Sequence, residues 1–414
     1  MIKLFLSNGH FRLYMMYQIF SGLGGGIFGV FMLLSVHMLY GNPMYTGIAG
    51  FLMIVPFVFS VAVGPIVDRN NKAKIMRLTT FLEFGVLALL TFTPLLETLG
   101  VVFMFGVIFV YSIAALFEAP SGTALLPHIV DENEILPANS MINIAALIGG
   151  IGIAFILFSA VGEDMNLRIV YGLSAAFLAG AFMFACFLRD PSAKGKNTEA
   201  PKYRYMTDLV AGWKFLRGSV LIYLMAAWIT MRIVMEISAT NMPAFAEYHV
   251  GVQGYIIFTV VGMVGSILAS SFIGSFGNKF KIGYFLAAML VLRGVSRVVF
   301  VYILPGNFYA GLASLLFFAA LSSSAGILYM SLEQKLPPKD MVGRIDTLTT
   351  TFFSLMGAVG ALLGGIVGRL VAHLDHIFIF QGYMYVVFGV LIFLIPAVRK
   401  LPKMDEIERA GNEE

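Results

Sequence analysis

Charged residues are scarce in this chain. Asp, Glu, Lys and Arg together make up 12% of its 414 residues, whereas 59% are hydrophobic and the mean hydropathy is +0.88. Soluble domains carry roughly 25% charged residues, so this composition excludes a soluble globular protein. The net charge of +4 does not indicate nucleic-acid binding, because the basic residues stand in loops between apolar runs rather than in one patch.

Cysteine and the common catalytic motifs are also missing or nearly so. Cys186 is the single cysteine, which excludes a disulfide framework and a cysteine metal site. The sequence has no G-x-x-x-x-G-K-[ST] loop for nucleotide hydrolysis and no H-E-x-x-H zinc helix, and its 6 histidines are scattered. We therefore expect a protein without enzyme activity, cofactor or metal.

Long apolar runs fill most of the sequence. They last about 20 residues, the length at which a helix crosses the hydrocarbon core, and they lack the alternation of a membrane barrel. The expected spans are 10–39, 45–67, 73–93, 99–119, 139–163, 167–188, 218–246, 251–273, 281–303, 307–331, 343–372 and 376–398. The first run is too long for a cleaved signal sequence. The sequence therefore predicts an all-α membrane protein with twelve transmembrane helices.

Basic residues indicate how the chain is threaded, since Lys and Arg in short loops mark the cytoplasmic side. When both termini are placed in the cytoplasm, all but five of the 27 Lys and Arg residues fall on that side. Of those five, Arg168 and Arg369 face the outside, and three lie within the membrane: Arg232, Arg293 and Arg297. We therefore expect a multi-pass protein with cytoplasmic termini.

One of the basic loops carries a recognisable motif. Gly64-Pro-Ile-Val-Asp68-Arg69 ends an apolar run, two asparagines follow, and Lys72 opens the next segment. This pattern, G-x-x-x-D-R-x-x-[RK] between two spans, resembles the loop between the second and third helices of major facilitator superfamily transporters. The resemblance implies that these four residues belong to a cytoplasmic gate, in which Asp68 approaches the start of the eleventh helix near Arg344.

The second half of the chain repeats features of the first. Gly274-Ser-Phe-Gly-Asn278-Lys279 matches the hairpin motif, and 336–343 matches 130–137 at nearly the same offset. The resemblance implies two parallel six-helix halves, with the substrate site near the bilayer midplane. The expected parts are an N-terminal six-helix bundle over 1–188, a cytoplasmic linker with an amphipathic helix over 189–217, a C-terminal six-helix bundle over 218–398 and a cytoplasmic tail over 399–414.

Four further segments narrow the resemblance. They are Gln18-x-x-Ser21-x-x-Gly24, the run from Glu118 to Pro127, the run from Asp208 to Leu216, and Glu333-Gln-Lys-Leu-Pro337. Together they are similar to the macrolide-efflux and enterobactin-exporter branch, which lies near bacterial lysophospholipid transporters. This implies a monomeric, proton-coupled secondary transporter of the bacterial inner membrane that exports an amphipathic drug-like or siderophore-like molecule. A lipid or lysophospholipid translocator and a transport-inactive sensor or scaffold remain as alternatives.

The chain departs from proton-coupled members of the superfamily at two places. Tyr111 stands where the fourth helix of drug antiporters commonly has an arginine, and the glycine series of the fifth helix is reduced to Gly149, Gly150 and Gly152. These replacements argue against proton antiport through the usual residues. Tyr111 itself remains a candidate for substrate binding or coupling.

Charged side chains within the spans are candidates for substrate binding and coupling, because a charge at that depth is costly. Arg232 and Glu236 lie one helical turn apart near the middle of the seventh span, where pairing offsets part of the desolvation cost. The alternative is a purely structural ion pair. We expect a break in this helix near Asn241 and Pro243. Glu83, deep in the third span, is a further candidate.

Polar residues on other spans complete the set of candidates. Gln18 on the first span, and Ser323 and Tyr329 on the tenth, can line a cavity, because buried amides and hydroxyls need partners or water. Arg293 and Arg297 lie one turn apart on the ninth span. For these two arginines we expect structural charge pairing with an acidic residue of a neighbouring helix.

Glycines recur at helical spacing in two spans. Gly22 and Gly26 lie on the first span, and the eleventh span carries Gly360, Gly364 and Gly368. Small residues at this spacing let two helices approach closely in lipid. We therefore expect tight helix contacts along both faces.

Cysteines placed in loops test the predicted threading. In a chain carrying Cys186→Ser, the cysteine of Lys196→Cys or Lys403→Cys should be shielded from membrane-impermeant thiol reagents in intact cells. The cysteine of Asn166→Cys should react, because it lies in an outside loop. Strong labelling of Lys196→Cys in intact cells would reverse the orientation.

Overall fold

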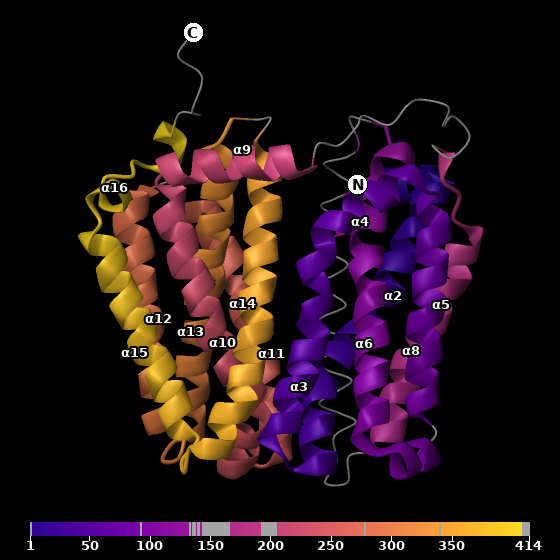
Figure 1. Ribbon diagram of the computed structural model, residues 1–414, viewed down its shortest axis with the longest axis horizontal. Helices are drawn as coiled ribbons and strands as arrows, with labels where there is room; N and C mark the ends of the chain where they lie inside the picture. The colour runs from indigo at the N-terminus through magenta and orange to yellow at the C-terminus, as the bar shows by residue number, and fades with distance from the viewer. Residues whose placement is uncertain are drawn as a thin grey trace. The chain divides into compact units, whose positions relative to one another are not determined.

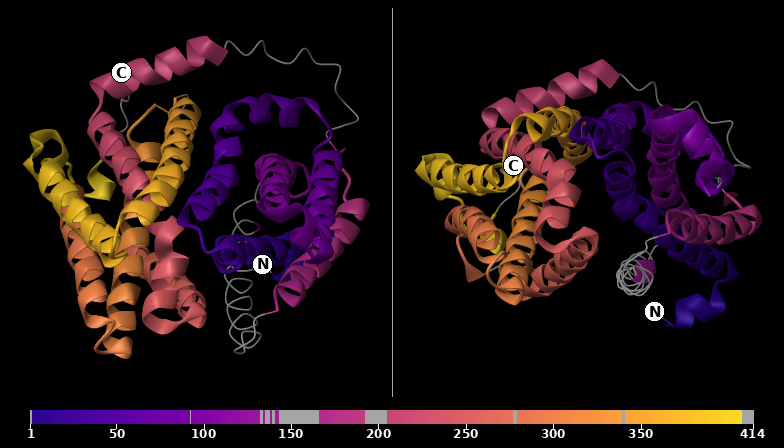
Figure 2. Two further views of the ribbon diagram at one scale, coloured as in Figure 1. Left: turned by 60° about the horizontal axis from the view of Figure 1, so that its bottom comes forward. Right: turned by 90° about the horizontal axis from the view of Figure 1, so that it is seen from below.

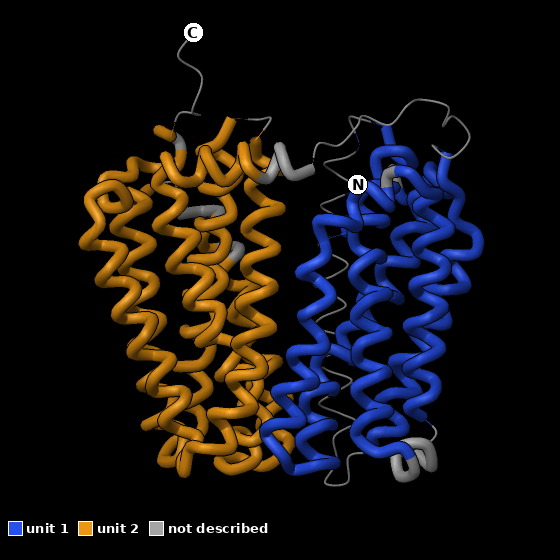
Figure 3. The backbone as a smooth tube through the Cα atoms, viewed as in Figure 1, with its two compact units in different colours: residues 1–202 blue, residues 203–414 orange. Residues whose placement is uncertain are grey.

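The structure is a computed structural model that describes residues 2–91, 93–131, 134, 138, 141–142, 166–191, 205–276, 279–338 and 341–407. Every regular element in these ranges is a helix, as the length of the apolar runs predicts. The chain forms two compact units, residues 1–202 and 203–414 (Figure 3). The expected fifth span over 139–163 lies almost wholly outside the described residues.

Unit 1 starts with a short helix and continues with helices that run the length of the unit (Figure 1). They are α1, Ile2–Ser7; α2, Gly9–Tyr40; α3, Pro43–Ile54, which continues through η1, Val55–Phe59, into α4, Ser60–Arg69; α5, Lys72–Leu90; α6, Thr93–Leu125, followed by η2, Leu126–His128; and α8, Leu167–Phe187. An asparagine side chain accepts a first-turn N–H at the start of α2, α3, α5 and α8. Such caps explain why these helices begin just before the apolar runs.

Unit 2 contains the remaining helices. They are α9, Tyr205–Gly218; α10, Leu221–Val250; α11, Val252–Phe276; α12, Ile282–Ile303; α13, Phe308–Lys335; α14, Val342–Leu370; α15, Asp375–Leu394; α16, Pro396–Arg399; and η6, Met404–Glu406. The amphipathic helix α9 lies across the ends of the spanning helices at one end of this unit (Figures 1 and 2). It packs on α10 and α14.

The described helices agree closely with the predicted spans. In this part of the chain, 10 helices are long and apolar enough to cross a membrane. α5, with 19 residues, lies where the third span is expected, and its several charges keep it out of that set. Eleven of the twelve predicted spans are therefore present as helices, and the remaining one is the span that the structure does not describe.

Two helices continue where the sequence predicts an end or a break. α6 passes through Pro120 to Leu125, and α10 passes through Pro243 to Val250. The predicted break near Asn241 is therefore wrong. Asn241 donates from Nδ2 to the backbone oxygen of Gly364 over 2.9 Å, which ties α10 to α14 at this point. Membrane helices tolerate proline because neighbouring helices and side chains satisfy the freed backbone groups.

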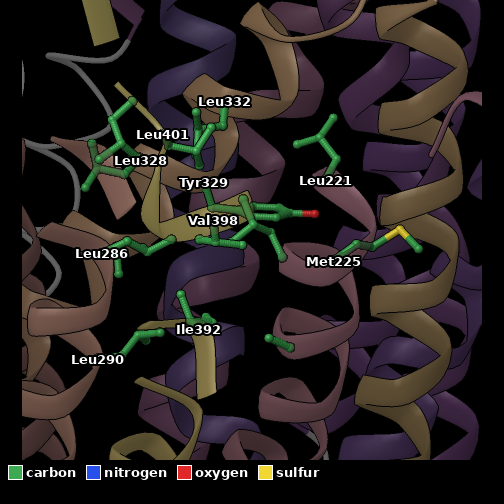
Figure 4. Packing of buried hydrophobic residues seen from close by; sticks show 14 of the residues in the cluster. Leu221, Met225, Leu286, Leu290, Leu328, Tyr329, Leu332, Ile392, Val398 and Leu401 are labelled. Carbon is green, nitrogen blue, oxygen red and sulfur yellow. The ribbon is translucent and has the colours of Figure 1, made fainter. Parts of the chain in front are cut away.

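A core of buried apolar side chains holds unit 2 together near the end that carries α9. Leucine, isoleucine and methionine side chains from α10, α12, α13 and α15 meet there (Figure 4). Val398 and Leu401 from the segment after α15 join the same core. Lys335 donates to the backbone oxygen of Met404. The C-terminal segment therefore closes this end of the unit.

The α4–α5 hairpin is fixed to the end of α8 within unit 1. Lys72 is buried; its backbone N–H donates to Asp190 Oδ2 over 2.8 Å, and its ammonium lies 3.9 Å from the same oxygen. Asp190 follows α8 by three residues. The hairpin and the last described turn of unit 1 are therefore one structural block.

Glycines bring α14 against α10. A Cβ added at Gly360 would lie 2.7 Å from the backbone oxygen of Ile233, and one added at Gly364 would lie 2.9 Å from Thr240 Cβ. Backbone atoms in this contact cannot move aside as a side chain can. The glycine face predicted on the eleventh span is therefore the surface that allows α14 to approach α10.

Alanine at Gly360 tests this contact. Because the added methyl group would overlap backbone, Gly360→Ala should lower the free energy of unfolding by about 1–3 kcal/mol. Gly262→Ala on α11 is the matched control, since no heavy atom lies within 4 Å of its added Cβ. Thermal unfolding of the two variants in the same detergent gives the comparison, and equal melting temperatures would contradict close packing at Gly360.

Candidate functional site

Unit 2 contains a cavity of about 200 Å³ among five of its helices. Its walls are largely apolar or aromatic, with two arginines and two serines among them. The lining residues are Trp228, Met231, Arg232 and Met235 of α10, Arg293 of α12, Ser322, Ser323 and Gly326 of α13, Phe353 of α14 and Tyr385 of α15. Few polar groups in an apolar cavity are typical of small-molecule sites.

Arg232 and Glu236 form an ion pair on α10. Arg232 Nη2 lies 2.5 Å from Glu236 Oε1, and the two side chains are 18% and 12% exposed. The guanidinium also covers the ring of Phe353 at 4.6 Å. Arg232 Nε has no hydrogen-bond partner. The ion pair predicted from the one-turn spacing is therefore present, and its arginine lines the cavity.

The close approach of α14 gives this pair its position. A Cβ added at Gly357 would lie 2.8 Å from Arg232 Nε, and one added at Gly360 would lie 3.0 Å from Glu236 Cβ. Larger residues at these two places would collide with the side chains of the pair. The glycine face of α14 therefore leaves the space that Arg232 and Glu236 occupy.

Arg293 and Arg297 do not pair with an acidic residue in the part of the chain that the structure describes. Arg293 Nη2 donates to Tyr385 Oη over 2.9 Å, and Arg297 Nε donates to Gln381 Oε1 over 2.8 Å. Gln381 Nε2 in turn donates to Tyr385 Oη over 3.2 Å. The predicted charge pairing is wrong because a polar pair on α15, one turn apart, faces the arginine pair on α12.

Aromatic rings provide the remaining compensation for these two charges. Arg293 Cζ lies 3.8 Å from the centre of the Tyr385 ring. Arg297 Cζ lies 4.7 Å from the rings of both Phe318 and Phe378. Ring faces attract cations more weakly than a carboxylate does in the same surroundings. The arginines are thus held in place without their charge being neutralised.

The other predicted residues of unit 2 lie beside the cavity. Ser323 Oγ donates to Ser266 Oγ over 2.7 Å, which links α13 to α11. Tyr329 is buried and stacks on Trp228, with ring centres 4.8 Å apart and an angle of 7° between the rings. Ser323 is part of the cavity wall, whereas Tyr329 supports the wall from behind through Trp228.

Unit 1 buries an acidic group in its interior. Glu83 on α5 is 0% exposed, and neither of its carboxylate oxygens receives a hydrogen bond. A second carboxylate, that of Glu118 on α6, is close enough to repel Glu83 when both are charged. Tyr17 and Ser21 of α2 each donate to Glu118 Oε1 over 2.5 Å. Two acidic side chains and two hydroxyls therefore meet inside this unit.

The network extends from Glu118 to α5. The Tyr17 hydroxyl lies 3.0 Å from Thr80 Oγ1, so Tyr17 connects α5 with α6. Thr80 stands one turn before Glu83 on the same helix face. The three helices α2, α5 and α6 therefore all contribute to the surroundings of the two carboxylates.

Gln18 and Tyr111 lie on the helices that hold this acidic group. Gln18 Nε2 donates to Tyr14 Oη over 3.0 Å. Tyr111 is buried and stacks on Phe28 at 3.7 Å between ring centres. A Cβ added at Gly25 would lie 3.0 Å from the Tyr111 hydroxyl. Tyr111 therefore packs between α2 and α6.

The residues predicted to form a cytoplasmic gate are divided between the two units. Gly64 and Arg69 lie on α4, and Lys72 makes the contact with Asp190 described above. The side chain of Asp68 lies outside the described part of the structure. Arg344 is on α14, where a Cβ added at Gly212 of α9 would lie 3.4 Å from its Cβ.

Several residues of both sites have no signal in the sequence alone. Thr80, Trp228 and Phe353 are ordinary residues of apolar helices. Gln381 and Tyr385 are more informative, because their one-turn spacing on the twelfth span matches that of the two arginines on the ninth. No three His, Cys, Asp or Glu side chains within the described residues gather as a metal site.

Comparison with known proteins identifies the family. Macrolide efflux protein A of Streptococcus pyogenes is 23% identical over 371 residues, which cover 87% of this chain and 89% of that protein. The Staphyloferrin A transporter of Staphylococcus aureus is 30% identical over 118 residues, 27% of this chain and 29% of that one. The crystal structure of a D-xylose-proton symporter superimposes with a TM-score of 0.71 at 14% identity, over 96% of this chain and 98% of that one. The sequence profile of the Major Facilitator Superfamily matches residues 14–361, and the chain belongs to this family of membrane transporters.

Proposed function

We propose that this transporter exports an amphipathic organic molecule from the bacterial cytoplasm by alternating access. The observation that carries the proposal is the cavity of unit 2, where apolar and aromatic walls enclose a small number of charged groups. Such walls suit a molecule with a large apolar part and one polar or charged group. The similarity to macrolide efflux protein A supports export over uptake.

The Arg232–Glu236 pair is the proposed substrate switch. A charged substrate group that enters the cavity competes with one member of the pair for the other. A cation would bind Glu236 and release Arg232, and an anion would do the reverse. Binding energy is then available to change the contacts of α10 with α14, because the pair lies at the interface between these helices.

The acidic group of unit 1 is the proposed proton site. The carboxylate oxygens of Glu83 have no hydrogen-bond partner in the described part of unit 1, and a buried carboxylate beside a second carboxylate is unfavourable when both are charged. A proton shared between Glu83 and Glu118 removes the repulsion and adds a hydrogen bond. Release and uptake of this proton would couple the transport cycle to a proton gradient.

Orientation and assembly are part of the same proposal. We place both termini in the cytoplasm and the protein as a monomer in the inner membrane. The basic α4–α5 hairpin supports this orientation, because Lys and Arg of short loops stay on the cytoplasmic side. In this orientation Lys72 and Asp190 lie at the cytoplasmic end of unit 1.

Transport in proteoliposomes tests the function. Inside-out vesicles with an acidic interior should accumulate a macrolide, a siderophore or a lysolipid only when the protein and the proton gradient are both present. Accumulation of the lysolipid alone would identify the protein as a lipid translocator. Binding of one of these molecules without accumulation, with or without a gradient, would contradict transport and identify a sensor or scaffold.

Substitution of each member of the ion pair distinguishes a cationic substrate from an anionic one. Glu236→Gln should abolish export of a cation, whereas Arg232→Gln should abolish export of an anion first. Loss of one partner of a buried pair costs up to about 3–5 kcal/mol, so thermal stability is measured on both variants. If both remain stable and transport normally at every pH, the pair has only a structural role.

Glu83→Gln tests proton coupling. Since glutamine imitates the protonated side chain, the variant should stay folded and still exchange substrate across the membrane, but it should lose accumulation driven by a proton gradient. Its exchange rate should also lose its dependence on pH. Asp131→Asn, at an exposed position beyond α6, is the control and should behave as the parent chain does. Normal gradient-driven accumulation by Glu83→Gln would remove this site from the mechanism.

A further inference from the structure

The positive charge of the unit 2 cavity indicates which chemical class of ligand it binds. This inference rests on the proposed function of the cavity as a substrate site. We propose that Arg293 and Arg232 bind the anionic group of an amphipathic molecule, a carboxylate or a phosphate, while the apolar part of the molecule lies against Trp228 and Phe353.

Arg293 is a buried cation with an unused donor. Its side chain is 6% exposed and lines the cavity, yet its Nε has no hydrogen-bond partner. The neutral hydroxyl of Tyr385 occupies only Nη2. A buried guanidinium without a carboxylate is costly in a membrane. An anion that enters the cavity supplies the missing negative charge.

The acidic residues of the surrounding helices do not neutralise this charge. Among the described residues of the helices around the cavity, Glu236 is the acidic residue that lies at the depth of the cavity. It is already paired with Arg232. The other acidic residues of these helices stand near helix ends: Glu247 on α10, Glu333 on α13 and Asp346 on α14. Asp375 at the start of α15 lies 2.7 Å from His249 Nε2. Arg232 and Arg293 line the cavity with a single glutamate beside them, so the cavity has an excess of positive charge.

Further donors point to the same conclusion. Ser322 and Arg232 line the cavity, and each keeps one buried donor atom without a partner, Ser322 Oγ and Arg232 Nε, the second of which lies beside Gly357 of α14. Tyr385 Oη accepts hydrogen bonds from both Arg293 and Gln381, which leaves its own proton to donate. Guanidinium and hydroxyl donors gathered on one cavity match the acceptor oxygens of a carboxylate or phosphate.

The volume of the cavity suits part of an amphipathic molecule. A volume of about 200 Å³ is below the roughly 300–1,000 Å³ of sites that enclose a whole drug-sized ligand. It accommodates the charged group and the first carbon atoms of an apolar chain. Trp228, Met231 and Phe353 provide the apolar surface for that chain.

Tryptophan fluorescence can measure this binding in the protein at rest. The chain has 2 tryptophans, so Trp213→Phe leaves Trp228 in the cavity wall as the reporter. The probes are octyl phosphate, octanoate, octyltrimethylammonium and octanol, added to the full chain in nanodiscs of phosphatidylcholine. We expect saturable quenching by the phosphate and the carboxylate at lower concentration than by the cation or the alcohol. Tighter binding of the cation would overturn the proposal.

Two arginines of the same helix provide matched variants. Arg293→Gln should weaken octyl phosphate binding by at least about tenfold, the size expected for one hydrogen bond to a charged group. Arg297→Gln removes the same charge one turn away, outside the cavity wall, and should weaken binding by much less. Arg293→Lys keeps the charge and should give an intermediate affinity even if Arg293→Gln unfolds. Equal effects of Arg293→Gln and Arg297→Gln would leave only a general electrostatic effect and overturn the assigned site.

The source of the anion is decided in the same assay. If the natural ligand is a lipid headgroup, nanodiscs that contain phosphatidylglycerol should compete with octyl phosphate at the cavity. If it is a dissolved amphiphile, the lipid should not compete. Because this measurement needs no transport, failure of anion binding leaves proposed export untouched, and failure of export leaves anion binding measurable.

Discussion

The cost of a charge in the hydrocarbon core determines where this chain can place polar side chains. Each charged group at that depth needs an ion pair, an aromatic face, a proton or a ligand. Arg232 and Glu236 form an ion pair with each other, and the guanidinium of Arg297 lies against aromatic rings. Several of these groups keep a buried atom without a hydrogen bond; among them, Arg293 lines the cavity without a carboxylate partner and Glu83 lies beside a second carboxylate. These are also the residues at which a ligand or a proton would stabilise the protein most.

The two units differ in the kind of site that they build. Unit 1 gathers two carboxylates with hydroxyl groups, an arrangement that suits proton exchange. Unit 2 gathers arginines among aromatic side chains around a cavity, an arrangement that suits a larger ligand. In the proposed function, unit 1 therefore carries the proton site and unit 2 carries the substrate site.

The fold was predictable because apolar length and the placement of basic residues are properties of single segments. The Arg232–Glu236 contact was predictable for the same reason, since both residues lie on one helix. Contacts between residues on different helices were not predictable in this way. Arg293 and Arg297 meet Gln381 and Tyr385 rather than an acid, because an amide and a hydroxyl among aromatic rings have no distinctive sequence pattern. Burial of Glu83 likewise depends on how α5 packs against α6 and α8.

The contact between Lys72 and Asp190 has a mechanical consequence. Asp190 lies shortly before the segment that leads to unit 2. Its side chain accepts a hydrogen bond from the backbone N–H of Lys72, the first residue of α5, and lies 3.9 Å from the ammonium of the same lysine. A pull on that segment is therefore carried directly into the α4–α5 hairpin instead of unwinding the last turn of α8.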